Sequence, residues 1–269
     1  MIELHPSRLP SLAPWFPAGS PGIGALAEHV LRTGNGRWWC DRPLNPRVLA
    51  VSCGDHALLR GDPRSLAAGE LGPLATHYVH ASAGFVPPLY AALEGVTPWE
   101  RMMYVRRATA LPARPPRGVT VRRLLAGDGQ ALAALGPQAS WIHGTWGGPH
   151  GLAGSGAAWG AFHRRELLAV ACTYFGGSRY EDVAVLADPG HRRRHLGLAC
   201  VSALCEDIAA RGRTPTWSCA RDNRPSRLLA WRAGFRLEHE YVHYATGGPR
   251  TPSPLRPAPL PRAAAPAGQ

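Results

Sequence analysis

One stretch of the sequence combines residue types that could bind a phosphate-containing ligand. It reads Val-Leu-Ala-Asp-Pro-Gly-His-Arg-Arg-Arg-His-Leu-Gly-Leu-Ala over 185–199. A strand-like end is followed by a turn, and an arginine-rich loop leads into an apolar helical pattern. Amides at a helix N-terminus are unpaired and lie at the positive end of the helix dipole, so they attract phosphate. Glycine lets the backbone approach the anion, and arginine adds charge-assisted hydrogen bonds. Taken alone, the stretch predicts a phosphate site, with a solvated basic turn as the alternative.

A second segment favours the phosphate site. Asn223-Arg-Pro-Ser226 begins 26 residues after Gly197 and leads into a helical pattern that ends in a Gly-Phe pair. The two segments together resemble the Gcn5-related N-acetyltransferase (GNAT) superfamily, and the resemblance covers residues 117–245. In that family a Gln/Arg-x-x-Gly-x-Gly/Ala loop holds the CoA pyrophosphate, and a later Asn-x-x-Ala/Ser segment forms the far wall. The Trp-x-x-x-Thr-Trp-Gly-Gly stretch that starts at Trp141 is similar to actinobacterial members with an N-terminal extension.

The resemblance implies that acetyl-CoA is the acyl donor. It places a strand end beside the pantetheine, the loop around the pyrophosphate, and two polar side chains beside the pantetheine or adenosine. The strand residues are Val185, Leu186 and Ala187. The loop residues are Arg192, Arg193, Arg194, His195, Leu196, Gly197, Leu198 and Ala199. The two polar side chains are those of Asn223 and Ser226.

Two positions depart from the family pattern. His195 stands where the first loop glycine is usual, although the frame Arg194-x-x-Gly197-x-Ala199 also satisfies the pattern. A histidine there either weakens cofactor binding or, when protonated, contacts a phosphate. Ala230 stands where many members carry a tyrosine that protonates the departing thiolate, so this chain lacks that acid.

Two adjacent carboxylates are candidates for a general base. Glu181 and Asp182 stand at the head of a predicted strand, and alternation turns them to opposite faces, so only one can face a cleft. Histone-type members keep a glutamate thirteen residues before the arginine that precedes the loop glycine. Glu181 stands at that distance from Arg194. We therefore predict Glu181 as the catalytic base; the alternative is a surface carboxylate paired with Arg179.

A glycine- and tryptophan-rich stretch over 141–150 is predicted as a loop that faces the acceptor. Loop residues on a rigid scaffold often bind substrate. We expect Trp141, His143 and Trp146 to contact the acceptor. The alternative is that the indole rings fill the core.

The elements that would position these residues follow from hydrophobic periodicity. Strands are predicted at 119–124, 158–162, 167–175, 180–186 and 216–220, followed by a strand pair within 236–244. Helices are predicted at 127–135, 196–210 and 226–232. The three strands between 158 and 186 read as an antiparallel meander. The predicted fold class is α/β: a GNAT-like mixed, mostly antiparallel sheet flanked by helices.

Shifts in composition divide the chain. The predicted parts are a smaller α/β N-terminal region at 1–110, a proline-rich linker at 111–117, the acyltransferase domain at 118–245 and a disordered tail at 246–269. The N-terminal region has an unclear role and shows no internal repeat. Within it, helices are predicted at 22–33 and 86–93, and a hairpin at 48–60.

Charge and cysteine content limit the possible partners. The net charge is +12, and all 30 basic residues are arginines, which favours anionic partners in general. The six cysteines form no Cys-x-x-Cys pair, and we expect buried thiols and no metal site. No apolar run approaches the roughly 20 residues that span a bilayer, and the N-terminus does not read as a secretory signal. We therefore expect a cytoplasmic protein that does not bind membranes.

These observations predict an acyl-CoA-dependent N-acyltransferase that transfers an acetyl group to a primary amine, on a small molecule or a peptide. One alternative is a CoA-binding regulatory or degenerate acyltransferase, motivated by His195 and Ala230. Another is a basic nucleic-acid-binding protein, but the arginines are scattered over both halves and nucleic acid is not the expected partner. The acceptor, the acyl chain length and the oligomeric state are left open.

Overall fold

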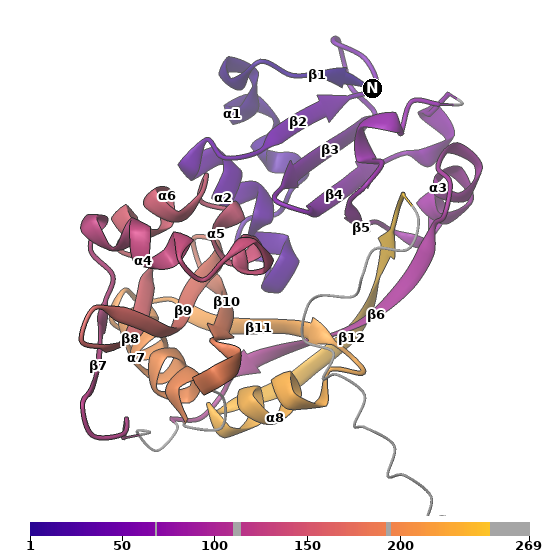
Figure 1. Ribbon diagram of the computed structural model, residues 1–269. Coiled ribbons are helices and arrows are strands. Elements are labelled where there is room, and N and C mark those ends of the chain that lie inside the picture. Colours follow the sequence, from indigo (N-terminus) through magenta and orange to yellow (C-terminus); the bar gives the residue numbers. More distant parts are fainter. Residues whose placement is uncertain (68, 110–113, 192–194, 248–269) are drawn as a thin grey trace, which may run out of the picture.

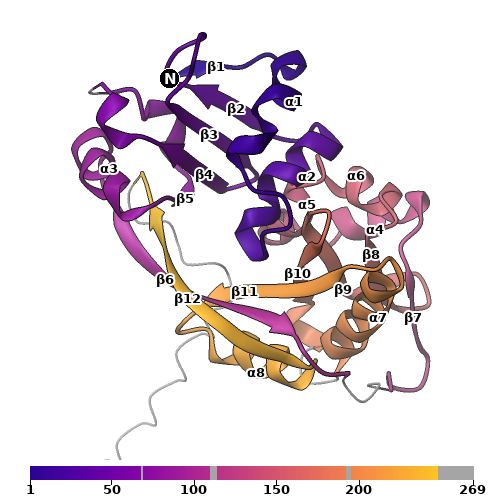
Figure 2. The same ribbon diagram turned by 180° about the vertical axis from the view of Figure 1, so that it is seen from behind.

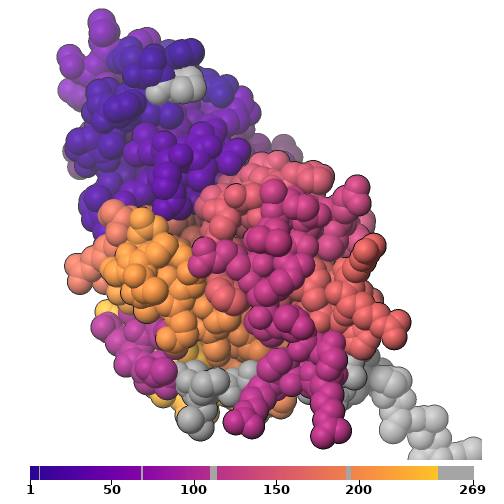
Figure 3. Space-filling model, turned by 90° about the vertical axis from the view of Figure 1, so that its left-hand side faces the viewer, coloured from indigo at the N-terminus to yellow at the C-terminus, as the bar shows by residue number. Residues whose placement is uncertain are grey.

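The computed structural model describes residues 1–67, 69–109, 114–191 and 195–247. These residues include twelve strands that form one mixed sheet, in the order β1-β2-β3-β4-β5-β12-β6-β11-β10-β9-β8-β7 (Figure 1). Helices flank this sheet, as the predicted fold class requires. The space-filling view shows the indigo N-terminal part packed directly on the orange and magenta C-terminal elements (Figure 3). No helix in the described ranges reaches the length and apolar character that crossing a membrane requires.

The strands and most of the helices predicted after residue 117 are present. The strands are β7 (Val119–Arg123), β8 (Ala158–His163), β9 (Glu166–Gly176), β10 (Tyr180–Ala187), β11 (Thr214–Ala220) and β12 (Phe235–Ala245). The helices are α4 (Gly129–Ala133), α5 (Trp141–Gly144), α6 (Pro149–Gly154), α7 (Leu196–Ala210) and α8 (Arg224–Arg232). The predicted meander is confirmed, because β9 pairs antiparallel with both β8 and β10.

Helix α7 packs on β8, β9 and β10. Its residues Leu196, Cys200, Leu204 and Ile208 recur at helical spacing and are buried in one core cluster with residues of these strands. The helix ends before Gly212, whose φ of 71° lies in the left-handed region that glycine adopts without strain. The predicted apolar stripe therefore fixes the helix that follows the arginine-rich loop.

The N-terminal elements also match the predictions made for them. The strands are β1 (Ile2–Glu3), β2 (Arg37–Cys40), β3 (Val48–Cys53), β4 (His56–Gly61) and β5 (Tyr78–His80). The helices are α1 (Leu9–Leu12), α2 (Leu26–Thr33) and α3 (Val86–Ala92). The predicted hairpin is β3 and β4, and the predicted helix at 22–33 begins with a 3-10 turn at Gly22–Ala25.

Four of the strands before residue 117 were not predicted, and the last of them joins the two halves of the chain. β6 (Thr97–Arg106) pairs antiparallel with β11 on one side and with β12 on the other. β12 in turn pairs with β5 on its far side. β6, the last strand of the N-terminal half, and β12, the last strand of the C-terminal half, thus each pair with a strand of the other half. They run side by side at the centre of the sheet (Figure 2). Strands from before and after the predicted linker at 111–117 therefore belong to one continuous sheet.

The topology repeats, although the sequence shows no repeat. From one edge the order is β1-β2-β3-β4-β5-β12, and from the other edge it is β7-β8-β9-β10-β11-β6. In each half, one pair of neighbouring strands is parallel, β4 with β5 and β10 with β11. The halves differ in the connection between these strands. α7 connects β10 to β11, whereas the described residues between β4 and β5 contain only short 3-10 turns.

Three predictions are corrected. The expected strand pair within 236–244 is one strand, β12, with an irregularity between Leu237 and His239 that bends it without a turn. The expected loop at 141–150 contains the two short helices α5 and α6. The tail does not begin at Thr246, because that residue is fully buried and its hydroxyl donates to the Leu74 carbonyl at 2.6 Å. Residues 248–269 lie outside the described residues.

Candidate active site

Strands β10 and β11 are paired only where they begin. Their parallel register joins Tyr180, Glu181 and Asp182 to Thr214, Pro215 and Thr216, and no further pair of these described strands follows. β10 is also irregular between Asp182 and Val183, where its register with β9 shifts. Beyond this point, the backbone groups of β10 that point toward β11 have no strand partner. Unpaired backbone groups beside a cavity can bind a ligand.

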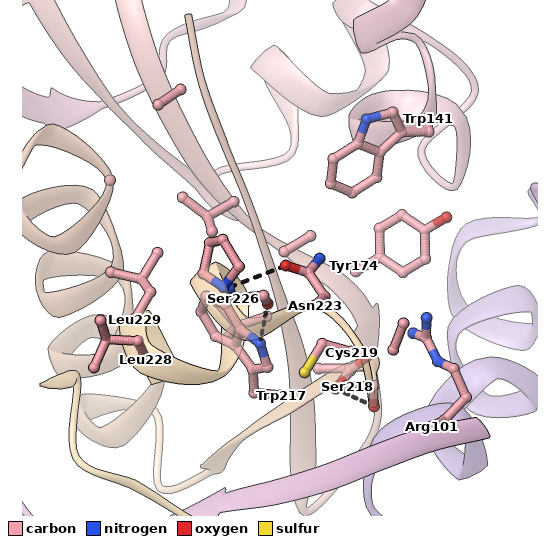
Figure 4. Close-up of a pocket in the computed structure, with 18 of the residues that line it drawn as sticks. Arg101, Trp141, Tyr174, Trp217, Ser218, Cys219, Asn223, Ser226, Leu228 and Leu229 are labelled. Atoms are coloured by element: carbon pink, nitrogen blue, oxygen red, sulfur yellow. Dashed lines mark hydrogen bonds between the residues drawn. The ribbon is translucent and has the colours of Figure 1, made fainter. Parts of the chain in front are cut away.

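A cavity of about 940 Å³ lies along this separation. At one end its walls come from β10, β11, α7 and α8. At the other end they come from β4, β5, β6 and β12, together with Tyr174 and Phe175 of β9. Figure 4 shows side chains from both ends, with Leu228 and Leu229 on the α8 side and Arg101 and Tyr174 on the opposite side. The N-terminal half therefore builds part of the cavity wall.

The first end contains most of the predicted cofactor residues. Val185 and Ala187 line the cavity from β10, and His195, Leu196, Gly197 and Leu198 line it from the start of α7. Leu186 packs against a different core cluster, as alternation along a strand requires, and Ala199 is a buried residue of α7. Arg192, Arg193 and Arg194 lie outside the described residues.

His195 adopts an unusual backbone conformation. It precedes the first residue of α7 with φ 58° and ψ 14°, in the left-handed region, and its carbonyl accepts a hydrogen bond from the Ala199 amide at 3.0 Å. This conformation favours glycine, the residue usual at this position in the family that the sequence resembles. The backbone at His195 thus has a conformation typical of glycine while a histidine occupies the position.

Asn223 and Ser226 hold the start of α8 against the cavity. The Asn223 side chain accepts a hydrogen bond from the Ser226 amide at 3.1 Å, which caps the helix. The Ser226 hydroxyl accepts from the Trp217 indole at 3.0 Å (Figure 4). Both residues line the cavity, so the structure brings them to the same wall as Gly197. These two hydrogen bonds hold the start of α8 and the Trp217 ring in place.

The second end of the cavity is lined by aromatic rings. Tyr78 and Trp99 are 4.6 Å apart between ring centroids, as are Tyr174 and Phe175. Trp141 lies 6.1 Å from Tyr174 and belongs to the same wall, as predicted. These rings come from β5, β6, β9 and α5 and enclose a chamber large enough for a small organic group.

Asp182 faces this cavity and is almost fully buried. Its Oδ1 accepts hydrogen bonds from the Thr216 hydroxyl at 3.0 Å and from the Ser218 hydroxyl at 3.3 Å. Burial raises the pKa of Asp182 to about 6, although these hydroxyls and the guanidinium of Arg101 act in the opposite direction. A carboxylate with this pKa, beside the separation of β10 and β11, can accept a proton near neutral pH.

Glu181, the predicted base, points to the other face of β10. Its carboxylate forms ion pairs with Arg211 at 2.9 Å and with Arg213 at 2.8 Å, and accepts a hydrogen bond from Thr173. Burial alone would raise the pKa of Glu181, but these partners outweigh it and hold the pKa below its ordinary value. Glu181 is not among the residues that line the cavity. Of the two carboxylates, the structure brings only Asp182 to the cavity.

His143 and Trp146 are also absent from the residues that line the cavity. The Trp146 indole donates to the Thr173 carbonyl at 2.7 Å and contacts the buried ring of His29. His143 is partly buried, which lowers its pKa. Of the three predicted acceptor contacts, the structure places Trp141 in the chamber and gives Trp146 the core position that was the alternative.

Comparisons with known proteins agree with this geometry. A family model described as GNAT acetyltransferase matches residues 132–244. A Streptomyces virginiae protein, described as an uncharacterized N-acetyltransferase in the mutA 5′ region, is 55% identical over 212 residues, which are 78% of this chain and 90% of the relative. This chain belongs to the GNAT acetyltransferase family.

Solved GNAT structures share the fold over most of the chain. A GCN5-related N-acetyltransferase-like protein from Streptococcus suis matches with a TM-score of 0.67 and 16% identity, over 89% of this chain and 98% of that one. A tandem GNAT protein from the clavulanic acid biosynthesis pathway matches with a TM-score of 0.58 and 14% identity, over 93% of this chain and 98% of that one. Both matches include the N-terminal half, which agrees with the repeated topology of the sheet.

One departure from the GNAT pattern has a structural explanation. Ala230 is fully buried in the core cluster that contains Trp217 and Phe235. Ala230 therefore packs in the core at the position where, by the resemblance, many GNAT members carry a tyrosine. Among the described residues, no group of three or more His, Cys, Asp and Glu side chains is arranged to hold a metal ion.

The sequence analysis missed the residues that line the second end of the cavity. Trp99 and Arg101 lie on β6, and Tyr241 and His243 lie opposite them on β12. The available signal was alternation in Thr97–Arg106, where Trp99 and Arg101 share one strand face. That signal was overlooked because the segment precedes a proline-rich stretch that was interpreted as a domain boundary.

Proposed function

We propose that this GNAT protein transfers an acetyl group from acetyl-CoA to a primary amine, with the pantetheine lying between β10 and β11. The observation that carries the proposal is the separation of these strands after Asp182, with a cavity that continues from α7 to the aromatic chamber. The thioester would lie near Val183–Val185, where α7 and α8 leave one narrow path to the chamber. The amine would enter from the chamber side.

Asp182 is the proposed general base, in place of Glu181. An ammonium group must lose a proton before its nitrogen lone pair can attack the thioester carbonyl carbon. Asp182 faces the chamber and its pKa is about 6, so it is ionised at neutral pH and can take that proton. Attack forms the C–N bond, the nitrogen releases its surplus proton, and the C–S bond breaks. The CoA thiolate leaves and is protonated to the free thiol, which balances that proton.

The backbone of β10 is the proposed site of carbonyl polarisation. Alternate residues beyond Asp182 direct their amides toward β11 without a strand partner. Such amides can donate to the thioester oxygen as negative charge develops on it. The rest of the acceleration would come from holding amine and thioester in line.

Binding of acetyl-CoA is the first test, measured by differential scanning fluorimetry. Acetyl-CoA is expected to raise the melting temperature of the wild type by mass action. Gly197→Glu is expected to abolish that rise. A Cβ on Gly197 would lie 3.4 Å from Val185 and 3.8 Å from Leu229, so a longer side chain must extend into the cofactor end of the cavity. Gly127→Glu is the matched control, because open space surrounds Gly127 and the cofactor should still stabilise that variant.

Release of CoA thiol in the presence of an amine panel is the second test. Amine-dependent release by the wild type would support acetyl transfer. Cofactor binding without release on any amine would favour the alternative of a CoA-binding protein without turnover. A wild type that millimolar acetyl-CoA does not stabilise would contradict the proposed function as a whole.

A further inference from the structure

The chamber contains a cation that has no counter-ion among the described residues. Arg101 lines the cavity from β6, and its guanidinium stacks over the Trp99 ring at 4.1 Å. None of the ion pairs between described residues includes Arg101. Its Nε is buried and, in the same part of the chain, has no hydrogen-bond partner. A buried donor without a partner destabilises the protein, more so when the group is charged, and a bound ligand that accepts its hydrogen bond would remove that cost.

Further polar atoms without partners surround Arg101. Tyr241 stands directly opposite it on β12. The Tyr241 hydroxyl lies close enough to Arg101 and Ser218 for both to lower its pKa, but its geometry to the described residues falls short of a full hydrogen bond. His243 is completely buried, and neither ring nitrogen has a partner within the described ranges. The Trp141 indole nitrogen is also buried and has no hydrogen-bond partner among the described residues. All of these residues line the cavity, so unused hydrogen-bonding capacity is concentrated at the chamber.

The charges of the chamber lie on one face of the sheet. Asp182 is paired in register with Thr216, and Arg101 with Ala220 and Tyr241, on neighbouring strands. The anionic group stands where β10 and β11 separate, and the cation stands toward β12. A ligand that complements this face has a positive amine beside Asp182 and a negative group beside Arg101. The aromatic walls between and around them match a flat, apolar body.

We propose that the acceptor is an amine that also carries a carboxylate and an aromatic body, as an aromatic amino acid does, with its carboxylate on Arg101 and Tyr241. This inference rests on the proposed transfer to an amine in this cavity. The planar fork of a guanidinium matches a carboxylate through two parallel hydrogen bonds. A carboxylate brings one negative charge to the single positive charge of Arg101, whereas a phosphate dianion would bring a buried excess of negative charge to it.

A binding experiment tests the carboxylate position without requiring turnover. In isothermal titration with CoA present, 3-phenylpropanoate is expected to bind the wild type about 10- to 100-fold more tightly than its neutral amide, 3-phenylpropanamide. Arg101→Gln is expected to remove this preference. Arg107→Gln is the matched control, because Arg107 follows β6 and pairs with Glu238 at the surface, outside the cavity. Equal affinity of the wild type for the acid and the amide would overturn the proposal.

A turnover experiment tests the acceptor class directly. Phenylalanine is expected to exceed 2-phenylethylamine by about 10- to 100-fold in kcat/KM, because the two differ by the carboxylate alone. Arg101→Gln should remove most of this preference, because kcat/KM for phenylalanine falls much further than that for 2-phenylethylamine, which responds only to the higher pKa of Asp182 in the variant. A variant that loses both activities equally, or a wild type that prefers 2-phenylethylamine, would contradict the carboxylate site.

The cofactor provides the measurement that separates the two proposals. Stabilisation by acetyl-CoA should be the same in Arg101→Gln and the wild type, because Arg101 lies across the cavity from Leu229, which neighbours Gly197 (Figure 4). If acetyl-CoA stabilises the wild type but the wild type does not prefer the acid to the amide, only the proposal about the acceptor is contradicted. Loss of stabilisation in the wild type would instead contradict the transferase function.

Discussion

The two adjacent carboxylates of β10 show how one position along a strand decides a role. Glu181 and Asp182 are both buried, yet one pKa is held down by two arginines and the other is raised to about 6. The difference lies in what each face of the strand meets. Glu181 meets cations that keep it ionised, whereas Asp182 meets only hydroxyls and a more distant guanidinium. A proton acceptor near neutral pH belongs to the second environment.

Asp182→Asn is expected to lower kcat by roughly 10²- to 10⁴-fold, the usual range for a lost general base. In the wild type, kcat/KM should fall as the pH drops below about 6, because protonated Asp182 can no longer accept a proton. The variant should lose this acid limb. Thiol-release rates from pH 5 to 9 measure both effects, with exposed Asp222→Asn as the control. Wild-type rates in Asp182→Asn across this range would remove Asp182 from the mechanism.

Glu181→Gln is expected to affect stability more than chemistry. It leaves two arginine side chains without their shared carboxylate, which should cost about 3 kcal/mol of unfolding free energy at neutral pH. Because the folded-state pKa of Glu181 is lowered, its contribution is fully present above the unfolded-state pKa. That contribution is lost as the pH falls through the folded value. Urea unfolding at pH 7 and pH 3 should therefore show a difference between wild type and variant that shrinks in acid. A difference that stays constant with pH would contradict this account.

At the scale of elements, the cofactor half of the site could be predicted from the sequence. The apolar spacing after Leu196 and the cap at Asn223 depend on local rules, so the helices predicted at 196–210 and 226–232 nearly coincide with α7 and α8. The acceptor half could not be predicted in the same way. Arg101 and Tyr241 become neighbours only through pairing of strands that lie far apart in the sequence, and local periodicity carries no information about such pairing.

The junction after β12 gives an element-scale prediction. The Thr246 hydroxyl donates to the Leu74 carbonyl at 2.6 Å and accepts from the His77 amide at 3.0 Å. Thr246→Val keeps the volume but removes both bonds of the hydroxyl and leaves only the 3.3 Å bond from the His77 amide to the Leu74 carbonyl. It should therefore reduce the unfolding free energy by about 1–3 kcal/mol in urea titrations. Thr97→Val is the control, since that hydroxyl bonds at an exposed position and its loss should cost under about 0.5 kcal/mol. Equal effects of the two variants would show that Thr246 is not a structural anchor.

At the scale of the whole molecule, the exchanged strands make the two halves depend on each other. β6 contributes buried residues such as Met102 and Tyr104 to the core cluster beneath α7, although it precedes the predicted linker. β12 in turn pairs with β5 of the N-terminal half, although it follows the predicted linker. The linker therefore connects two halves that share one sheet, and the cavity has walls from both.

Separately expressed fragments 1–109 and 114–269 are expected not to fold alone. The first fragment would leave both edges of β6 unpaired, and the second would leave a gap between β11 and β12. Dispersed amide signals in heteronuclear NMR should appear only when the fragments are co-expressed and purified as a complex. A fragment 114–269 that folds and binds acetyl-CoA by itself would contradict this dependence.

The exchange of β6 and β12 also has a consequence for synthesis on the ribosome. β6 ends at Arg106, but its partners begin at Thr214 and Phe235, so it leaves the exit tunnel long before either is made. At bacterial or eukaryotic elongation rates this delay is about 5–20 s. For that time Met102, Met103 and Val105, which are buried in the finished protein, belong to a strand with two open edges. On a polysome, the nearest complementary edges are those of other nascent copies, so trigger-factor-like holdases that cover this segment should raise the yield of native protein.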